Sequence, residues 1–238
     1  SFATAETFGN VKRKDRHMNI RIDTHSHTLA SGHAYNTLRE MAAMAAGERP
    51  LEALGSHRTR PGNAGILPTI LFSESAGGSR TLYNIHLLLG TELNIMDREG
   101  NVDLPQGVIR DLDIVIASLH TPCFKDERTQ ENVMQAYLSV MENPYIDIIG
   151  HPDDGRFPAD YEVLAREAKR TGTLLEVNNS SSGPDGYRGE YHGKLSEDAG
   201  ACKKEGTMVV FGSDAHLIWT LQNILLQRTG KEDSIFRK

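Results

Sequence analysis

Residues 113–120 read DIVIASLH, a run of β-branched and aliphatic side chains that ends at a histidine. Apolar runs of this length are typical of strands that are buried on both faces of a parallel sheet. Residues 85–92, which read IHLLLGTE, show a similar pattern and end at a carboxylate. Both stretches therefore predict buried strands that carry an ionisable side chain at the C-terminal end.

Similar apolar runs, separated by helical patterns, recur along the chain. Further strands are predicted at residues 19–23, 51–55, 145–150, 174–178 and 208–212, and helices at residues 37–46, 130–141, 159–171 and 197–205. Strands that alternate with helices predict an α/β fold with a parallel sheet, either open or closed into a barrel.

Length and composition narrow the class of protein. The 238 residues suit one α/β domain, and 38% apolar side chains are enough for a buried core. A net charge of -6 argues against a nucleic-acid binder but allows a small anionic substrate if metal ions supply positive charge. Two cysteines indicate a reducing compartment, and we expect a cytoplasmic protein. No apolar run is long enough to span a bilayer.

The two ends of the chain and one internal stretch differ from the rest. Residues 1–17 are polar and lack a signal-peptide core, so we expect an extension outside the fold. Residues 18–238 are predicted to form a single domain. Within that domain, residues 56–79 and 217–238 are atypical, because neither stretch continues the pattern of strands and helices.

Histidines and carboxylates follow the predicted strands at the point where each strand ends. They are His25, His27, Glu92, His120, His151, Asp214 and His216, with Asn178 at a further strand end. In barrels and doubly wound sheets, active sites form at this edge. We therefore expect these side chains to gather in one place.

Each of these residues also has a structural interpretation. His25 and His27 can face the same metal ion, but a pair of hydrogen-bonded histidines is the commoner case for such spacing. Glu92 ends a buried strand, so its carboxylate requires an ion pair, hydrogen bonds or a metal. Asp23 is better placed to orient a ligand histidine than to bind a metal.

Two residues are candidates for substrate contact. Arg156 lies in a loop that reads DDGR and can contact a phosphate or form a salt bridge within the loop. Asn178 can position a substrate or make the hydrogen bonds of a turn.

The complete set of motifs resembles the polymerase-and-histidinol-phosphatase (PHP) superfamily. The motifs are DTHSH at 23–27, Glu92, HTP at 120–122, HP at 151–152, EVNNSS at 176–181 and GSDAH at 212–216. The sequence is most similar to the branch of phosphatases that hold three zinc ions. The resemblance implies a distorted (β/α)7 barrel.

The resemblance also implies a set of metal ligands. His25, His27, Glu92 and Asp214 would hold one ion. Glu92, His120 and His151 would hold a second, with Glu92 as the bridge. His33 and His216 would hold a third ion together with one more histidine, which the family places after the second strand.

This chain departs from the family at that last ligand. The expected position holds Thr59, and His57 lies two residues away, which is several Å along a strand. Codon degeneracy allows a one-nucleotide change of reading frame to turn residues 58–65 into EHGPGMPG, which restores the family motif. The alternative is true divergence of a loop.

We expect a phosphatase that hydrolyses a phosphate monoester with a metal-bound hydroxide, which Glu92 and Asp214 would help to hold. The expected cofactor is zinc, up to three ions, with manganese as the alternative. The expected partner is a small phosphorylated substrate, with no nucleic acid and no membrane, and the oligomeric state is open. Alternative functions are a nuclease or phosphodiesterase of the same superfamily, or a catalytically impaired metal-binding remnant.

Overall fold

The computed structural model describes residues 22–47, 53–57, 80–182 and 194–221. The predicted extension at 1–17 and most of the atypical stretches at 56–79 and 217–238 lie outside these residues. The predicted division of the chain into an extension and one domain therefore stays a prediction.

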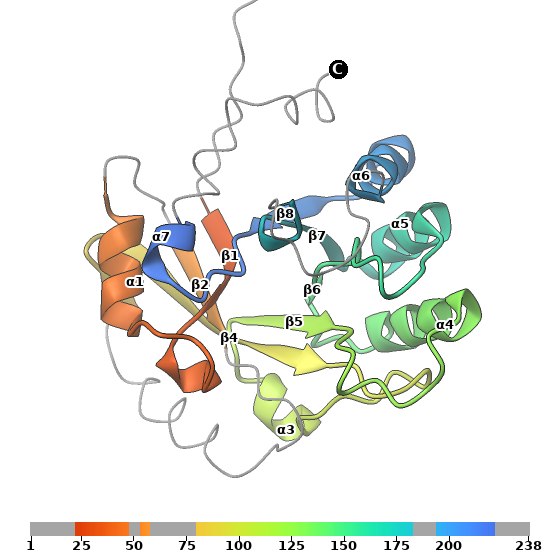
Figure 1. Cartoon of the computed structure of the whole chain (residues 1–238), viewed down its shortest axis with the longest axis horizontal. Coiled ribbons are helices and arrows are strands. Elements are labelled where there is room, and N and C mark those ends of the chain that lie inside the picture. The colour runs from red at the N-terminus through yellow and green to blue at the C-terminus, as the bar shows by residue number, and fades with distance from the viewer. Residues whose placement is uncertain (1–21, 48–52, 58–79, 183–193, 222–238) are drawn as a thin grey trace, which may run out of the picture.

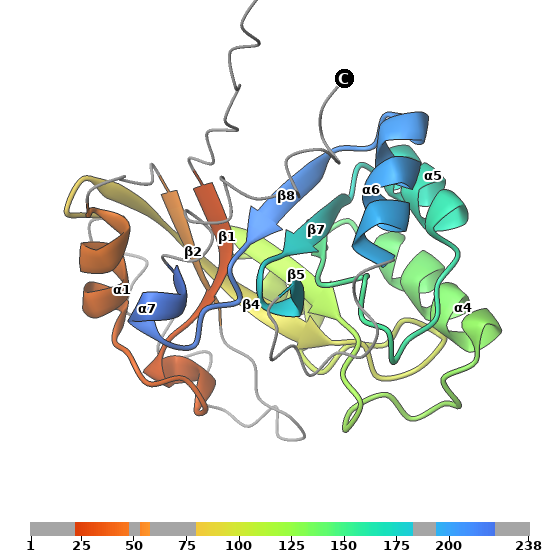
Figure 2. The ribbon, with the colours of Figure 1, turned by 45° about the horizontal axis from the view of Figure 1, so that its top comes forward.

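Seven parallel strands form one strongly curved sheet in the order β1-β2-β4-β5-β6-β7-β8. They are β1 (Ile22–His27), β2 (Ala53–His57), β4 (Ile85–Asn94), β5 (Ile114–Ser118), β6 (Ile148–Ile149), β7 (Leu174–Asn178) and β8 (Val209–Gly212). A short strand β3 (Thr81–Leu82) pairs antiparallel with β4. The first and last strands, β1 and β8, lie side by side, as Figure 2 shows. The fold is the distorted (β/α)7 barrel that the family resemblance implies.

The seam between β1 and β8 explains the distortion. One isolated parallel bridge, between Ser26 and Ala215, joins the two edges. At this bridge the His27 main-chain N–H donates to the Ala215 carbonyl at 2.9 Å. The Thr24 hydroxyl donates to the Phe211 carbonyl at 3.0 Å. Side-chain hydrogen bonds thus replace part of the ladder that would close a regular barrel.

The interior of the barrel has an apolar layer and a polar layer. Toward the N-terminal ends of the strands, Ile114, Ile116 and Ile148 form a cluster against which Leu88, Leu174 and Val210 pack. Residues two positions further along a strand face the same side. Those positions hold small or polar residues, namely Ser118, Gly150, Glu176 and Gly212. The polar residues of the interior therefore lie above the layer formed by Ile114, Ile116 and Ile148, which we call the apolar floor.

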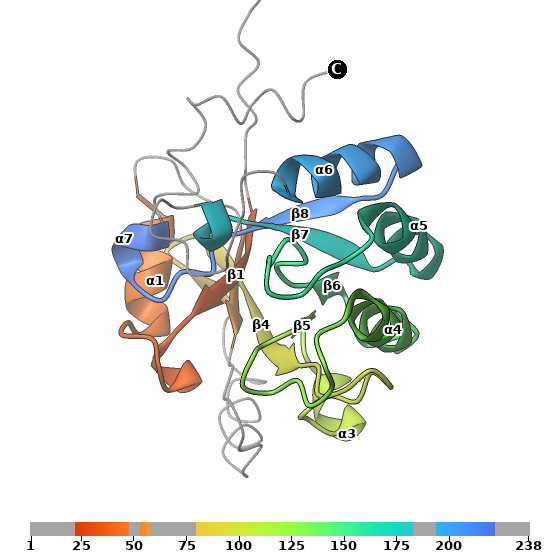
Figure 3. The ribbon, with the colours of Figure 1, turned by 45° about the vertical axis from the view of Figure 1, so that its right-hand side comes forward.

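Helices cover the outside of the sheet. They are α1 (Leu38–Ala45), α3 (Gln106–Ile109), α4 (Gln130–Met141), α5 (Tyr161–Thr171), α6 (Lys194–Glu205) and α7 (Ile218–Leu221), with 3-10 turns η1 (Leu29–Ser31) and η2 (Ser180–Ser182). Figures 1 and 3 show α4, α5 and α6 stacked beside the β5–β8 half, and α1 with α7 beside β1 and β2. Two buried apolar clusters fill these contacts. Among the described helices, none is both long and apolar enough to cross a membrane.

Capping residues explain where helix α5 begins and ends. The Asp160 carboxylate caps α5 by accepting from the main-chain N–H groups of Glu162 and Val163, both at 3.1 Å. Gly172 ends the helix with φ of 83°, a conformation that glycine adopts at little cost. These caps agree with the predicted helix at 159–171.

The strands differ from the predicted ones at three places. The first predicted strand ended at residue 23, but β1 continues to His27 and buries all of its residues after Ile22. The turn at Tyr83 and Asn84, with φ of 53° and 65°, makes the unpredicted hairpin of β3 and β4. The predicted strand at 145–150 is reduced to the two residues of β6.

Candidate metal centre

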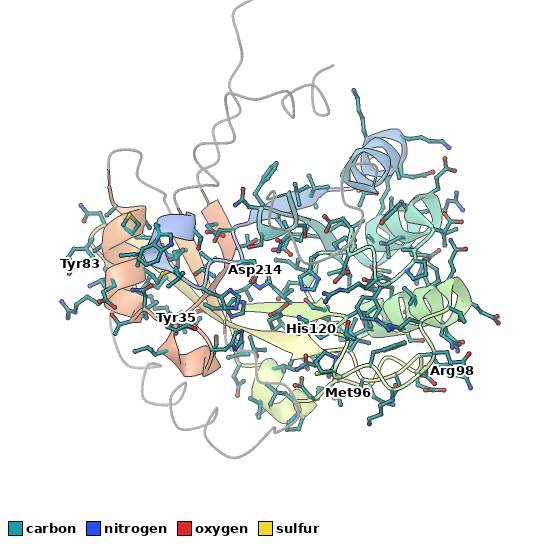
Figure 4. The ribbon with its side chains drawn as sticks, in the orientation of Figure 1. Tyr35, Tyr83, Met96, Arg98, His120 and Asp214 are labelled. Carbon is teal, nitrogen blue, oxygen red and sulfur yellow. The ribbon has the colours of Figure 1, made fainter. Side chains whose placement is uncertain are left out.

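The C-terminal ends of the strands bring the predicted ligands together. His25 and His27 lie on β1 and Glu92 on β4, whereas the other predicted ligands lie just beyond strand ends or in the loop after η1. Figure 4 shows Asp214 and His120 near the middle of the molecule, although they come from opposite sides of the barrel.

Ligand atoms gather in three groups within which all atoms lie within 4.8 Å of one another. The groups are His25, His27 and Asp214; Glu92, His120 and His151; and His27, His33 and His216. We call them the first, second and third ligand groups. All eight residues predicted as metal ligands are thus brought together in the structure.

Glu92 stands between the first two groups. Its Oε2 lies 3.5 Å from Nε2 of both His25 and His27. Its Oε1 lies 3.1 Å from Nε2 of His151 and 3.4 Å from Nε2 of His120. The two oxygens of one carboxylate therefore face two different sets of imidazoles, which is the arrangement of a bridging ligand.

The Nδ1 atoms of most of these histidines are occupied by other groups, which leaves Nε2 to face the centre. Those of His33 and His216 donate to main-chain carbonyls, of Ser31 at 3.0 Å and Asp214 at 2.9 Å. Since a carbonyl only accepts, the proton of a neutral ring in this position lies on Nδ1 and the lone pair on Nε2. His27 Nδ1 lies 3.0 Å from the Ser31 hydroxyl. Such partners set the tautomer that a metal needs.

Sequence reasoning missed these orienting residues. Asn94 Oδ1 accepts from His120 Nδ1 at 2.8 Å, and its own amide donates to the Asp103 carboxylate at 2.5 Å. Glu176 Oε1 lies 2.7 Å from His25 Nδ1 and is fully buried. A signal for Glu176 existed, because a carboxylate inside the apolar run at 174–178 requires a partner just as Glu92 does.

Asp23 is buried and binds main chain rather than an imidazole ring. Its Oδ1 accepts from the N–H groups of His25 at 3.1 Å and of Ser213 at 2.9 Å. Asp23 therefore joins the two strands that carry the first ligand group, and its contact with the ligand His25 is through the main chain. Burial raises the pKa of its carboxyl to about 6, against the lowering effect of the Ser213 hydrogen bonds.

The histidines and carboxylates of the centre shift one another's pKa values. Burial alone would lower the pKa of His25, but the charges of Glu176, Glu92 and Asp214 raise that pKa well above its ordinary value. Burial would raise the pKa of Glu92, but His25 and His120 lower it well below its ordinary value.

The pKa of His216 is shifted in the direction opposite to that of His25. Burial and the neighbouring His27 lower its pKa to about 4. Its imidazole is therefore neutral near pH 7, which is the form that binds metals.

The donor set fits a divalent transition metal. Imidazole nitrogens with one or two carboxylates are the usual ligands of catalytic zinc. The Nε2 atoms of His25 and His27 are 3.0 Å apart. Two nitrogens about 2.0–2.1 Å from a tetrahedral ion would be separated by roughly 3.3 Å, so little movement is required.

The remaining predicted residues have structural partners. Arg156 binds the buried Asp154 carboxylate through Nε at 2.9 Å and Nη2 at 2.5 Å, which is the loop salt bridge considered above. Asn178 is buried and donates to Glu176 at 3.0 Å. The main chain of His57 pairs with His27 between β2 and β1, but its side chain lies outside the described part of the structure.

Comparisons with known proteins agree with this arrangement. No family model matches the chain. A protein of Clostridium novyi named a probable phosphatase is 40% identical over 209 residues, which cover 87% of this chain and 83% of the relative. The histidinol phosphate phosphatase of Lactococcus lactis, solved with zinc, L-histidinol and phosphate, superposes with a TM-score of 0.54 at 17% identity over 88% of this chain and 94% of that one. A chain of an archaeal ribonuclease P solved with mature tRNA gives 0.51 at 16% identity, over 90% and 86%. At such low identities the two solved structures support the fold alone.

Proposed function

This chain belongs to the polymerase-and-histidinol-phosphatase (PHP) superfamily, and we propose that its centre is a metal-dependent phosphatase site for phosphate monoesters. Zinc is the proposed metal, with manganese as the alternative, and the proposed substrate is a small phosphorylated molecule. The named relative in Clostridium novyi, a probable phosphatase at 40% identity, supports the reaction class.

One observation carries the proposal, which is the placement of Glu92 between two groups of imidazoles. A carboxylate that faces two ligand sets can hold two ions close together, as in phosphatases that use two metals. Bound ions would supply a nucleophilic water at neutral pH and would offset the negative charge of the phosphate.

The residues around the centre set the direction from which a substrate approaches it. The apolar floor of Ile114, Ile116 and Ile148 lies beneath the centre. By contrast, the side chain of His120 is 21% exposed, and His33 is exposed. A substrate therefore approaches from the C-terminal face of the barrel, past His120 and the third ligand group.

The roles proposed for Arg156 and Asn178 follow from their different burial. Arg156 is half-buried, and the hydrogen bonds to Asp154 use its Nε and Nη2. We propose that its guanidinium provides positive charge for the phosphate from this fixed position. Asn178 is buried beside Glu176, so its contribution is to support the centre.

The test is an assay of an aryl phosphate monoester with protein that has been loaded with zinc or manganese. We expect Glu92→Gln and His120→Ala each to reduce kcat by at least 100-fold. Glu92→Gln replaces the bridging carboxylate with a neutral amide that has one oxygen, and His120→Ala removes an imidazole ligand from the centre. Glu162→Gln, an exposed substitution on α5, is the matched control and should leave kcat unchanged. Unchanged turnover in Glu92→Gln would contradict the proposal.

Metal stoichiometry and a second substrate separate the alternatives. Three bound ions favour a complete phosphatase, two an impaired one, and none a remnant. An aryl phosphodiester tests the nuclease or phosphodiesterase alternative. Faster hydrolysis of the diester than of the monoester would replace the proposed substrate class.

A further inference from the structure

We infer that Glu176 is a positioning residue, which holds His25 in the tautomer whose Nε2 carries no proton and can bind a metal. The inference rests on the proposed function in one respect only, which is that His25 binds an ion. Otherwise it depends on the hydrogen bonds around Glu176, and each of these can be assigned a direction.

Glu176 is fully buried and its carboxylate faces three nitrogen atoms. Oε1 lies 2.7 Å from His25 Nδ1. Oε2 accepts from the main-chain N–H of His151 at 2.7 Å and from the side-chain amide of Asn178 at 3.0 Å.

The two partners of Oε2 are donors by necessity. A main-chain N–H such as that of His151 cannot accept. The amide of Asn178 is oriented by Ser181, whose main-chain N–H donates to Asn178 Oδ1 at 3.2 Å. The NH₂ group of Asn178 must therefore face Glu176, and the Oε2 position requires an oxygen.

This requirement decides what an isosteric Glu176→Gln variant would do. The glutamine oxygen must occupy the Oε2 position, because an NH₂ group there would face two donors. Its NH₂ group would then occupy the Oε1 position and donate to His25 Nδ1. The proton of a neutral His25 would have to move to Nε2, the atom that lies 3.0 Å from His27 Nε2. A protonated Nε2 cannot bind a metal ion.

Gly212 provides an independent way to move Glu176. A Cβ atom at position 212 would lie 1.9 Å from Glu176 Oε1 and 2.7 Å from the Cβ of His25. The glycine thus makes room for the contact between Glu176 and His25. Gly212→Ala keeps the carboxylate in the protein but forces it away from His25.

The experiment compares wild type, Glu176→Gln, Gly212→Ala and the control Glu162→Gln. Binding of cobalt(II) is followed by its visible absorption and by calorimetric titration, and the ring tautomer of His25 is measured by ¹⁵N NMR of histidine-labelled protein at a pH where the ring is neutral. We expect both variants at the centre to bind one ion about 10–100-fold more weakly, while the other ions bind as in wild type. In Glu176→Gln the proton of His25 should lie on Nε2.

The outcomes separate this inference from the proposed function. Glu176→Gln with wild-type cobalt affinity and the proton of His25 on Nδ1 would overturn the inference. A wild-type protein that binds no ion would overturn the proposed function, and the tautomer of His25 would still decide the role of Glu176. Should Gly212→Ala fail to fold, the isosteric Glu176→Gln variant decides alone.

Discussion

Ser31 connects two ligand groups, because its side chain contacts one ligand histidine and its main chain contacts another. Its hydroxyl lies 3.0 Å from His27 Nδ1, and its carbonyl accepts from His33 Nδ1 at 3.0 Å. The 3-10 turn η1, which contains Ser31, is capped by Thr28, whose hydroxyl accepts from the N–H of Ala30. A short capped turn therefore orients one imidazole of the first group and one of the third.

Ser31→Ala removes only the hydroxyl, and we expect it to weaken metal binding by about 10-fold. The physical reason is that loss of an orienting hydrogen bond leaves the ring of His27 free to rotate. The measurement is competition for zinc against a chromophoric chelator. Ser139→Ala, which removes a hydroxyl bound to the Arg98 carbonyl far from the centre, is the control. Equal zinc affinities of Ser31→Ala and wild type would contradict the role of Ser31.

Asp154 gives the stability of the protein a dependence on pH. Burial would raise the pKa of its carboxyl, but the hydrogen bonds from Arg156 outweigh burial and hold that pKa below the ordinary value of 3.8. A group with a lowered pKa in the folded state stabilises the fold above its unfolded pKa, and loses this effect as the pH falls through the folded value.

We therefore expect the stability advantage of wild type over Asp154→Asn to be complete near pH 6 and to shrink below pH of about 4. The difference in free energy of unfolding between the two proteins is measured by urea unfolding of metal-free protein at a series of pH values. The exposed pair of Glu162 and Lys204 allows Glu162→Asn as a control, for which we expect little effect. An advantage that grows as the pH falls would show that the sign is wrong.

At the scale of elements, the polar layer of the barrel is possible because glycine stands there at the end of β8 and directly after β6, at Gly212 and Gly150. A Cβ atom at Gly150, next to β6, would lie 2.2 Å from the Ser118 hydroxyl and 2.8 Å from a methyl group of Ile116. Overpacking of this kind forces side chains out of their rotamers or shifts the backbone.

Gly150→Ala should reduce the free energy of unfolding by about 1–3 kcal/mol. Gly200→Ala is the matched control, because Gly200 lies in helix α6 with no neighbouring atom within 4 Å of an added Cβ. Alanine should stabilise that helix by about 0.5–1 kcal/mol. Chemical denaturation of both variants measures the difference, and equal effects at the two positions would contradict the packing argument.

The elements that follow a simple periodicity could be predicted from the sequence. The apolar run at 113–119 became β5 within one residue at each end, and the helix at 130–141 became α4 with the same bounds. The end of β1 was predicted four residues too early, because THSH has no apolar pattern although all four residues are buried. Their burial depends on partners from distant strands, which local periodicity does not contain.

The residues of the metal centre could likewise be predicted only in part from the sequence. His25, His120 and Asp214 could be predicted as neighbours because parallel strands deliver their C-terminal ends to one edge. Ser31 and Asn94 could not, since a serine in a turn and an asparagine at a strand end are ordinary residues in many proteins. Their roles arise only from distances to particular imidazoles.

At the scale of the whole molecule, the first ligand group closes the barrel. His25 and His27 come from β1, whereas Asp214 follows β8, and Asp23 and Ser213 at the same seam are 190 positions apart in the chain. An ion bound to these residues would join two edges that share one isolated bridge.

We therefore expect chelation of the metal to lower Tm. An ion present at 1,000 times its Kd stabilises the folded state by about 4 kcal/mol. For a chain of this size, roughly 2–4 °C of Tm accompanies each kcal/mol, so the loss should be near 10 °C. Calorimetry with a chelator, and then with added zinc, measures the loss and its recovery. Tm values that do not change on chelation would contradict a closing role for the metal.

The apolar floor of the barrel has a consequence for turnover. Because Ile114, Ile116 and Ile148 fill the N-terminal end of the described barrel, the centre is open toward the C-terminal face, where the side chain of His120 is 21% exposed. If the centre hydrolyses phosphate esters as proposed, the incoming ester and the departing inorganic phosphate offer the same oxygens to the same ligands. Free phosphate would then compete directly with the substrate, and its accumulation would raise the apparent KM of the reaction.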